Sequence, residues 1–104
     1  MGNIPQFVSE DLDTVLPEWL IHFLWFIIKD IPSDQLGRQQ VFELKETATG
    51  QFIRLTQNHP TYRQEFCIPC PYAVNAKVSV IHDRYKVTMQ LSAEQIEQSE
   101  PNNS

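Results

Sequence analysis

The longest apolar segment of the chain predicts a helix from about Val15 to Asp30. Asp13 and Thr14 offer oxygens that cap a helix N-terminus, Pro17 suits a first helical turn, and Pro32 ends the helix. Apolar residues at helical spacing form two stripes on different sides of this helix. Because one sheet covers only one side of a helix, the second stripe is either buried under another part of the chain or forms an interface. The first stripe is Leu16, Leu20, Phe23, Leu24, Ile27 and Ile31, and the second is Ile21, Trp25 and Ile28.

After Pro32 the apolar residues alternate with polar ones, which predicts β-strands. Turn signals separate five such segments: Gln40 to Glu46, Phe52 to Gln57, Tyr62 to Ile68, Lys77 to Ile81 and Val87 to Leu91. The simplest fold is α+β, with one long N-terminal helix packed on an antiparallel β-meander of four to five strands. A capping-box spacing also predicts a short C-terminal helix from Ala93 to about Ser99. We therefore expect one domain over residues 7–96, with flexible ends at residues 1–6 and 100–104.

Charge is distributed unevenly along the 104 residues, which carry 8 basic and 13 acidic side chains and a net charge of −5. Residues 1–18 and 90–104 hold acidic residues and no Lys or Arg. Nucleic-acid-binding surfaces concentrate basic side chains, so we predict no direct nucleic-acid contact. The acidic ends either aid solubility or meet a basic partner. In the second case the candidate residues are Glu10, Asp11, Asp13, Glu94 and Glu97.

The sequence also bears on cellular location. Its most apolar run, Trp19 to Ile28, has ten residues, well short of the ~20 that span a bilayer. The first five residues show no basic, apolar signal-peptide pattern. We therefore expect a cytoplasmic protein without membrane contact.

The order of several short motifs resembles a known family. Phe23-Leu24-Trp25 precedes Gln40-Val41-Phe42-Glu43-Leu44, and Thr88-Met89-Gln90-Leu91 follows near the end. This order is similar to that of a small family of Gram-positive bacteria and their phages, known only as domain of unknown function 960. The family's Asp-Asp-Gly-Asp-His before Thr-Met is replaced here by the segment from His82 to Lys86. The resemblance implies an α+β cytoplasmic protein without assigned catalytic residues, and its phage members suggest a role in phage–host conflict.

Cys67 and Cys70 form the sharpest local chemical motif, a C-x-x-C pair. No predicted helix follows them, whereas redox C-x-x-C pairs use a helix N-terminus to lower the thiol pKa. A zinc site needs four ligands, which His59 and His82 would have to complete. A metal-binding or thiol function of this pair is the alternative interpretation of the protein. The simple interpretation of the motif is two free cysteines, which need no partner in a reducing cytosol.

No catalytic constellation or phosphate-binding glycine loop is visible, so we predict a non-enzymatic protein without a cofactor. The leading hypothesis is a protein-interaction module that also self-associates as a homodimer. A narrower form is an inhibitor of a host defence effector, similar in role to an anti-CRISPR protein. Besides the acidic ends, the candidate contacts are Ile21, Trp25 and Ile28 on the helix and the turn residues Arg84, Tyr85 and Lys86. The turn is either a solvated loop or a contact for an acidic partner.

Overall fold

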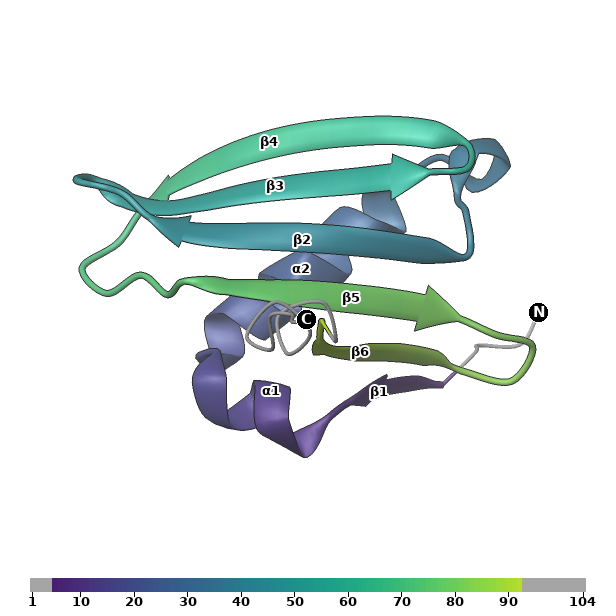
Figure 1. The fold of residues 1–104 in the computed structure, drawn as a ribbon, viewed down its shortest axis with the longest axis horizontal. Coiled ribbons are helices and arrows are strands. Elements are labelled where there is room, and N and C mark those ends of the chain that lie inside the picture. Colours follow the sequence, from purple (N-terminus) through teal and green to yellow (C-terminus); the bar gives the residue numbers. More distant parts are fainter. Residues whose placement is uncertain (1–4, 93–104) are drawn as a thin grey trace, which may run out of the picture.

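One six-stranded sheet forms most of the molecule (Figure 1). The structure is a computed structural model, and it describes residues 5–92. The strands are β1 (Gln6–Val8), β2 (Gln39–Glu46), β3 (Gly50–Asn58), β4 (Thr61–Pro69), β5 (Ala76–His82) and β6 (Val87–Leu91). The helices are α1 (Glu10–Val15), α2 (Glu18–Asp30) and the short 3-10 helix η1 (Ser33–Gln35). The strand order is β1-β6-β5-β2-β3-β4. Only β1 runs parallel to its neighbour, so the sheet is mixed.

The expected single long helix is wrong, because the chain forms two helices that meet at Pro17. Leu16 has extended backbone angles, as the residue before a proline prefers. The N-cap of α1 is Ser9, whose side chain accepts a hydrogen bond from the Leu12 backbone N–H at 3.3 Å. The helix α1 therefore starts before the expected caps, Asp13 and Thr14. The N-cap residue of α2 is Pro17, which makes no side-chain capping bond.

The expected antiparallel meander is also wrong. Strands β2, β3 and β4 follow one another as hairpins, but β5 then pairs with β2 on the far side from β3. Two side chains hold the connecting segment 70–75 against the strand ends. Gln51 accepts a hydrogen bond from the Val74 backbone at 2.8 Å, and Asn75 accepts one from the Glu46 backbone at 2.9 Å. The connection that these contacts hold in place leads from β4 to β5, on the side of β2 away from β3.

The first strand was not expected. β1 begins at Gln6, inside the segment predicted to be a flexible end, and it pairs with β6 from Gln6–Val87 to Val8–Met89. The predicted C-terminal helix lies outside the described residues.

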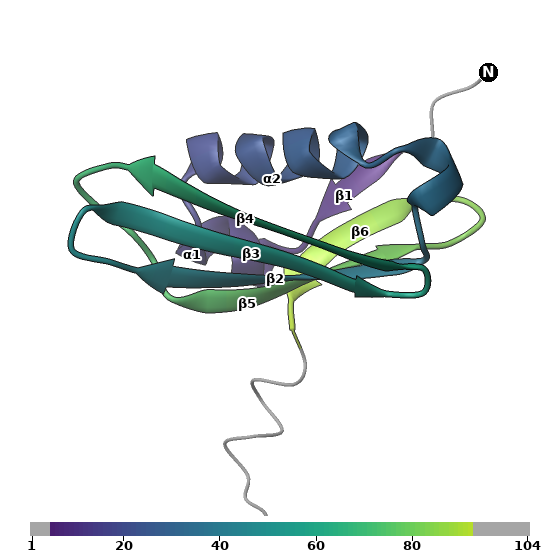
Figure 2. The same ribbon diagram turned by 90° about the horizontal axis from the view of Figure 1, so that it is seen from above.

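The helix α2 lies across one face of the sheet, and the core lies between them (Figure 2). Alternate strand residues such as Phe42, Ile53 and Val80 point to this face and are buried. Residues between them, such as Glu43, Arg54 and Glu65, lie on the opposite face, which no other element within residues 5–92 covers (Figure 2). This two-sided pattern is the one expected for a sheet with a single covered face.

Candidate functional site

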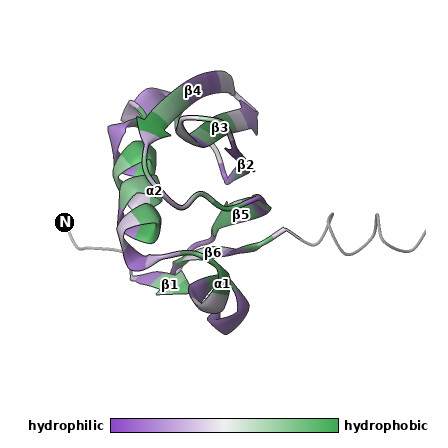
Figure 3. Cartoon of the chain, turned by 90° about the vertical axis from the view of Figure 1, so that its left-hand side faces the viewer, coloured by the Kyte–Doolittle hydropathy of each residue, from purple (hydrophilic) through white to green (hydrophobic). Residues whose placement is uncertain are grey.

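Three aromatic residues on α2 form a partly exposed row, which we call the α2 aromatic row: Trp19, Phe23 and Phe26. Trp19 is 41% exposed and Phe26 is 62% exposed. The ring of Phe23 stacks on Phe26 at a centroid distance of 6.2 Å and meets Phe66 of β4 edge-on at 5.7 Å. The helix is largely hydrophobic along its length (Figure 3). The row therefore continues from the helix surface onto β4.

The second apolar stripe predicted as an interface is not on the surface. Ile21 and Ile28 are each 5% exposed and belong to the core, and Trp25 packs against that core. The stripe is covered because α2 lies in the curve of the sheet, with α1 near one of its ends (Figure 2). The exposed apolar side of the helix is the side of Trp19 and Phe26 instead.

The outer edge of β4 is the longest unpaired strand edge in the described structure. β4 is the last strand of the sheet and pairs with β3 over nine residues. The side chains of Tyr62, Gln64, Phe66 and Ile68 face the helix side and are half-buried. Such an edge presents backbone N–H and C=O groups that can pair with another strand. We call this edge together with the α2 aromatic row the β4–α2 face.

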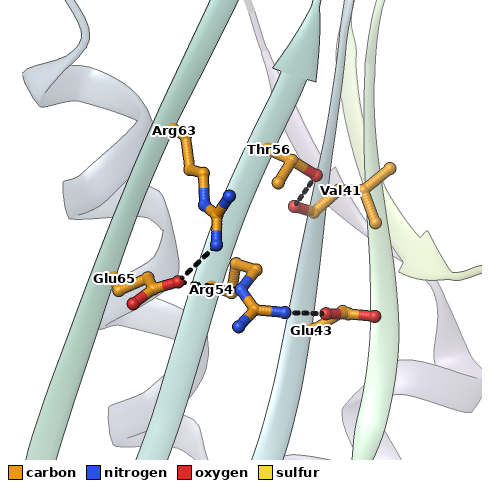
Figure 4. Close-up of polar contacts among 6 residues, drawn as sticks. All are labelled: Val41, Glu43, Arg54, Thr56, Arg63 and Glu65. Atoms are coloured by element: carbon orange, nitrogen blue, oxygen red, sulfur yellow. Dashed lines mark hydrogen bonds and ion pairs between the residues drawn. The ribbon is translucent and has the colours of Figure 1, made fainter.

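Charged side chains on the opposite face form a chain of ion pairs across β2, β3 and β4 (Figure 4). Arg54 contacts Glu43 at 3.1 Å and Glu65 at 3.0 Å, and Arg63 contacts Glu65 at 2.8 Å. Hydrogen bonds from Arg63 and Arg54 hold the pKa of Glu65 below its ordinary value. Glu65 is thus a carboxylate at neutral pH and lies beside the β4 edge.

Two buried glutamines organise the end of the sheet where β2 begins. The Gln57 side-chain oxygen accepts hydrogen bonds from the Gly37 backbone and from Gln40, both at 2.7 Å. Its nitrogen donates to the Gln35 and Pro60 carbonyls, also at 2.7 Å. These four bonds tie the loop before β2 to the β3–β4 turn.

A groove of about 1100 Å³ lies at this end of the sheet. Its lining includes His59 and His82, the guanidinium-bearing Arg38 and Arg84, and Asp83. Burial lowers the pKa of His82, whose ring nitrogen lies 2.6 Å from the Gln40 side-chain oxygen. Within residues 5–92, Arg38 and Arg84 have no side-chain hydrogen bond or ion pair.

The predicted turn contacts Arg84, Tyr85 and Lys86 have different surroundings. Arg84 lines the groove, and Tyr85 is 75% exposed. The Lys86 ammonium lies 5.5 Å from the centre of the Phe7 ring, a cation–π contact with β1. Asp83 accepts backbone hydrogen bonds from Tyr85 and Lys86, which lower the Asp83 pKa and shape the turn.

The structure does not bring the four proposed metal ligands together. His59 and His82 line the groove, whereas Cys67 and Cys70 lie at the other end of β4. Cys67 lies six positions after Thr61, a span of roughly 20 Å along a strand. Among residues 5–92 no group of three or more His, Cys, Asp or Glu side chains is arranged to hold a metal ion. Both cysteines are free thiols.

The structure describes three of the five acidic residues that were predicted to contact a basic partner. Glu10, Asp11 and Asp13 are exposed on α1, whereas Glu94 and Glu97 lie outside the described residues. Neither α-helix within residues 5–92 has the length and apolar character that a membrane crossing needs.

Comparisons with known proteins define the family. The chain belongs to the family described as staphylococcal protein of unknown function, DUF960, whose model matches residues 5–94. A crystal structure of a protein of unknown function from Enterococcus faecalis is similar, with a TM-score of 0.76 and 20% sequence identity. The match covers 88% of this chain and 90% of that chain, and at this identity it shows a shared fold alone. No curated protein matches the sequence.

Sequence reasoning placed Trp19 and Phe26 on the helix but not on its exposed side. Both are apolar, so hydrophobicity does not separate them from Leu20 or Leu24 in the core. The inward-facing Gln40 and Gln57 were also missed as a site, although their signal was present. Each occupies a strand position where alternation calls for an apolar residue, and a buried amide needs hydrogen-bond partners.

Proposed function

We propose that this protein is a non-catalytic interaction module that binds a strand of a partner protein along the β4–α2 face. The observation that carries the proposal is the nine-residue edge of β4 with an exposed aromatic row beside it. Binding by strand addition takes affinity from backbone hydrogen bonds and specificity from side chains beside the edge.

The partner segment has a definite chemistry. It is extended, because only an extended backbone matches the N–H and C=O spacing of β4. On the helix side it carries an apolar residue that covers Phe26, since an exposed aromatic ring is a frequent anchor in interfaces. On the other side it carries charges that match the Arg63–Glu65 pair.

Site-specific photocrosslinking in native host cells tests this proposal. A photoreactive phenylalanine analogue replaces Phe26 in one variant and Tyr85 in a control, because both side chains are exposed and only Phe26 lies on the β4–α2 face. We expect a crosslinked protein from position 26 and none from position 85. Equal products at both positions, or none at position 26, would contradict the proposal.

A narrower form of the proposal gives the module the role of an inhibitor of a bacterial defence effector. Its support is the exposed acidic set Glu10, Asp11 and Asp13 on α1, which would meet a basic nucleic-acid channel. Reversing these three charges to Lys should abolish inhibition in a phage-plating assay. A matched triple reversal of Asp30, Asp34 and Glu46, also exposed, should leave inhibition intact. Equal loss from both triples would contradict this role.

A second candidate function is the docking of an acidic protein segment in the groove. The specific observation is that Arg38 and Arg84 both line it without a charged partner in the described part of the chain. A tetraglutamate peptide is the probe, and the NMR signals of His82 report its binding at the groove. We expect these signals to shift in the wild type and in Arg63→Gln, but not in the double variant Arg38→Gln, Arg84→Gln. An unshifted wild type would contradict this function.

A further inference from the structure

The central residues of β4 are complementary to themselves when read in opposite directions. The segment from Tyr62 to Phe66 reads aromatic, basic, Gln, acidic, aromatic. We infer that β4 pairs antiparallel with β4 of a second copy of this chain, with Gln64 facing Gln64 of the partner subunit. This inference rests on the proposed function, because it assigns the occupant of the β4–α2 face.

The charges on the outer face fit this register. An antiparallel pair centred on Gln64 places Arg63 directly opposite the partner subunit's Glu65, and Glu65 opposite the partner subunit's Arg63. Within one chain the Arg63 guanidinium already reaches along the strand to Glu65 at 2.8 Å, and its side chain is 61% exposed. Glu65 also contacts Arg54 at 3.0 Å, and its side chain is 42% exposed, so both charged groups remain accessible at the edge. Opposite charges that face each other across strands stabilise pairing.

The aromatic residues on the helix side fit the same register. Tyr62 comes to lie opposite the partner subunit's Phe66, which places two rings side by side on the face that α2 covers. Phe66 already meets Phe23 edge-on at 5.7 Å, and Phe23 stacks on Phe26. The aromatic row of each copy thus continues into the seam between the strands. One register satisfies both faces of the sheet at once.

Neighbouring registers do not fit. Moving the centre to residue 63 places Arg63 against the partner subunit's Arg63. Moving it to residue 65 places Glu65 against the partner subunit's Glu65. Like charges directly opposite each other destabilise a strand pair. The side chains therefore select the centre at Gln64 from among its nearest alternatives.

A second copy also accounts for the length of the exposed edge. A twofold pair buries the same edge on both chains, so the contact closes after two copies. The joined sheet then ends on both sides in β1, a strand of three residues. Short terminal strands are one way in which proteins limit further edge pairing.

Disulfide trapping tests the register directly. In the inferred pair Thr61 lies opposite the partner subunit's Cys67, at the Cα separation of about 4.5–5.5 Å that a disulfide accepts. Within one chain the two positions are six residues apart on one strand, so they do not bridge. The test variant is Thr61→Cys with Cys70→Ser, oxidised by oxidised glutathione and analysed on a non-reducing gel. Melting of the reduced variant checks that it is folded.

Two controls keep Arg63 and Glu65 in place. Cys70→Ser alone retains only the Cys67 thiol, and adding Cys67→Ser to the test variant retains only the introduced thiol. We expect at least a fivefold excess of covalent dimer from the test variant over either control, with the crosslink mapped between positions 61 and 67. Equal trapping in all three, or none in the test variant, would overturn the inference. A Phe26 crosslink to a different protein in that case would leave the proposed function standing.

Discussion

The two edges of the sheet are built differently. On one side the three residues of β1 pair with β6, and α1, which follows β1 in the chain, also contacts β6 (Figure 1). On the other side β4 runs for nine residues, and no element within residues 5–92 covers its outer edge. The first edge is short and followed at once by a helix, which limits strand pairing. The second is long and open, which makes it a template for another strand.

The open edge is also fixed firmly in place. Gln57 and Gln51 are both buried in β3 and lie near its two ends. Gln57 bonds to the Pro60 carbonyl before β4, and Gln51 bonds to Val74 in the segment after β4. A strand held at both ends loses little conformational freedom when it binds, and this preorganisation favours affinity.

The strongest effect on the β4 edge should come from Gly50→Ala. A Cβ at Gly50 would lie 2.1 Å from the Ile68 carbonyl oxygen and 2.8 Å from the Cys70 nitrogen, both backbone atoms. The backbone must therefore move where β3 and β4 pair. We expect a loss of about 3 kcal/mol or more in the free energy of unfolding, measured by urea denaturation. The exposed neighbour Thr49→Ala serves as the control, and an equal loss there would contradict this account.

Gln57→Ala should be the next largest change. It removes the acceptor of the half-buried Gly37 N–H and one of the two acceptors of the buried Gln40 amide nitrogen. It also removes a donor to the Pro60 carbonyl, just before β4. Buried polar groups left without partners cost roughly 1–3 kcal/mol each. We expect about 2–3 kcal/mol less stability and faster amide exchange at Thr61 and Tyr62. Unchanged exchange at these two residues would show that Gln57 does not anchor β4.

On the β1 side of the sheet, stability should depend on pH through His82. Burial lowers its pKa below the ordinary value of 6.5, so the unfolded chain binds the proton more readily. The contribution of neutral His82 to the free energy of unfolding is fully present above about pH 6.5. It is lost as the pH falls through the lower pKa of the folded state. Charged and titratable groups in the same groove are Arg38, His59, Asp83 and Arg84.

Urea denaturation from pH 8 to pH 5 measures this dependence. In wild type the stability should fall over the acidic part of the range, and His82→Gln should flatten that part of the curve. His22→Gln is the matched control, because that ring is exposed on α2. An identical slope in wild type and His82→Gln would contradict the assignment.

The smallest effect should come from Phe7→Ala on β1. The substitution removes the ring beneath the Lys86 ammonium, and Phe7 is already 50% exposed. An exposed cation–π contact is worth about 0.5–1 kcal/mol, so we expect a loss of that size. Lys86→Met should cost a similar amount, and the double variant no more than either single one. Fully additive losses would mean that the two side chains act independently.

Sequence patterns located the later strands well. The five expected segments match β2 to β6 within one or two residues at each end, because alternation is strong where one face is buried. β1 was missed because three residues carry too little pattern, and its partner β6 lies about eighty residues later. The return of β5 to β2 is accompanied by side-chain bonds of Gln51 and Asn75 to distant backbone groups, which no local pattern reveals.

The candidate site was only partly predictable. The apolar excess on α2 predicted a side that the sheet does not cover, but it assigned that side to Ile21, Trp25 and Ile28, which lie in or against the core. It did not show which side stays exposed, because Ile21, Trp25 and Phe26 are all apolar. The open edge of β4 depends on strand order, which follows from long-range pairing rather than from local sequence. Once that order is known, the self-complementary segment from Tyr62 to Phe66 can be read from the sequence itself.

Charge reversal across β4 tests the central claim most directly. In Arg63→Glu, acidic side chains at positions 63 and 65 of the two copies lie opposite each other, and in Glu65→Arg, basic side chains do. Because like charges repel, each variant alone should sediment as a monomer. An equimolar mixture restores two opposite-charge pairs and should sediment as a dimer, as the wild type should. Glu43→Arg removes a contact of Arg54 two strands from the edge and should remain dimeric. A wild-type monomer at all concentrations, or a mixture no more dimeric than its components, would contradict the account.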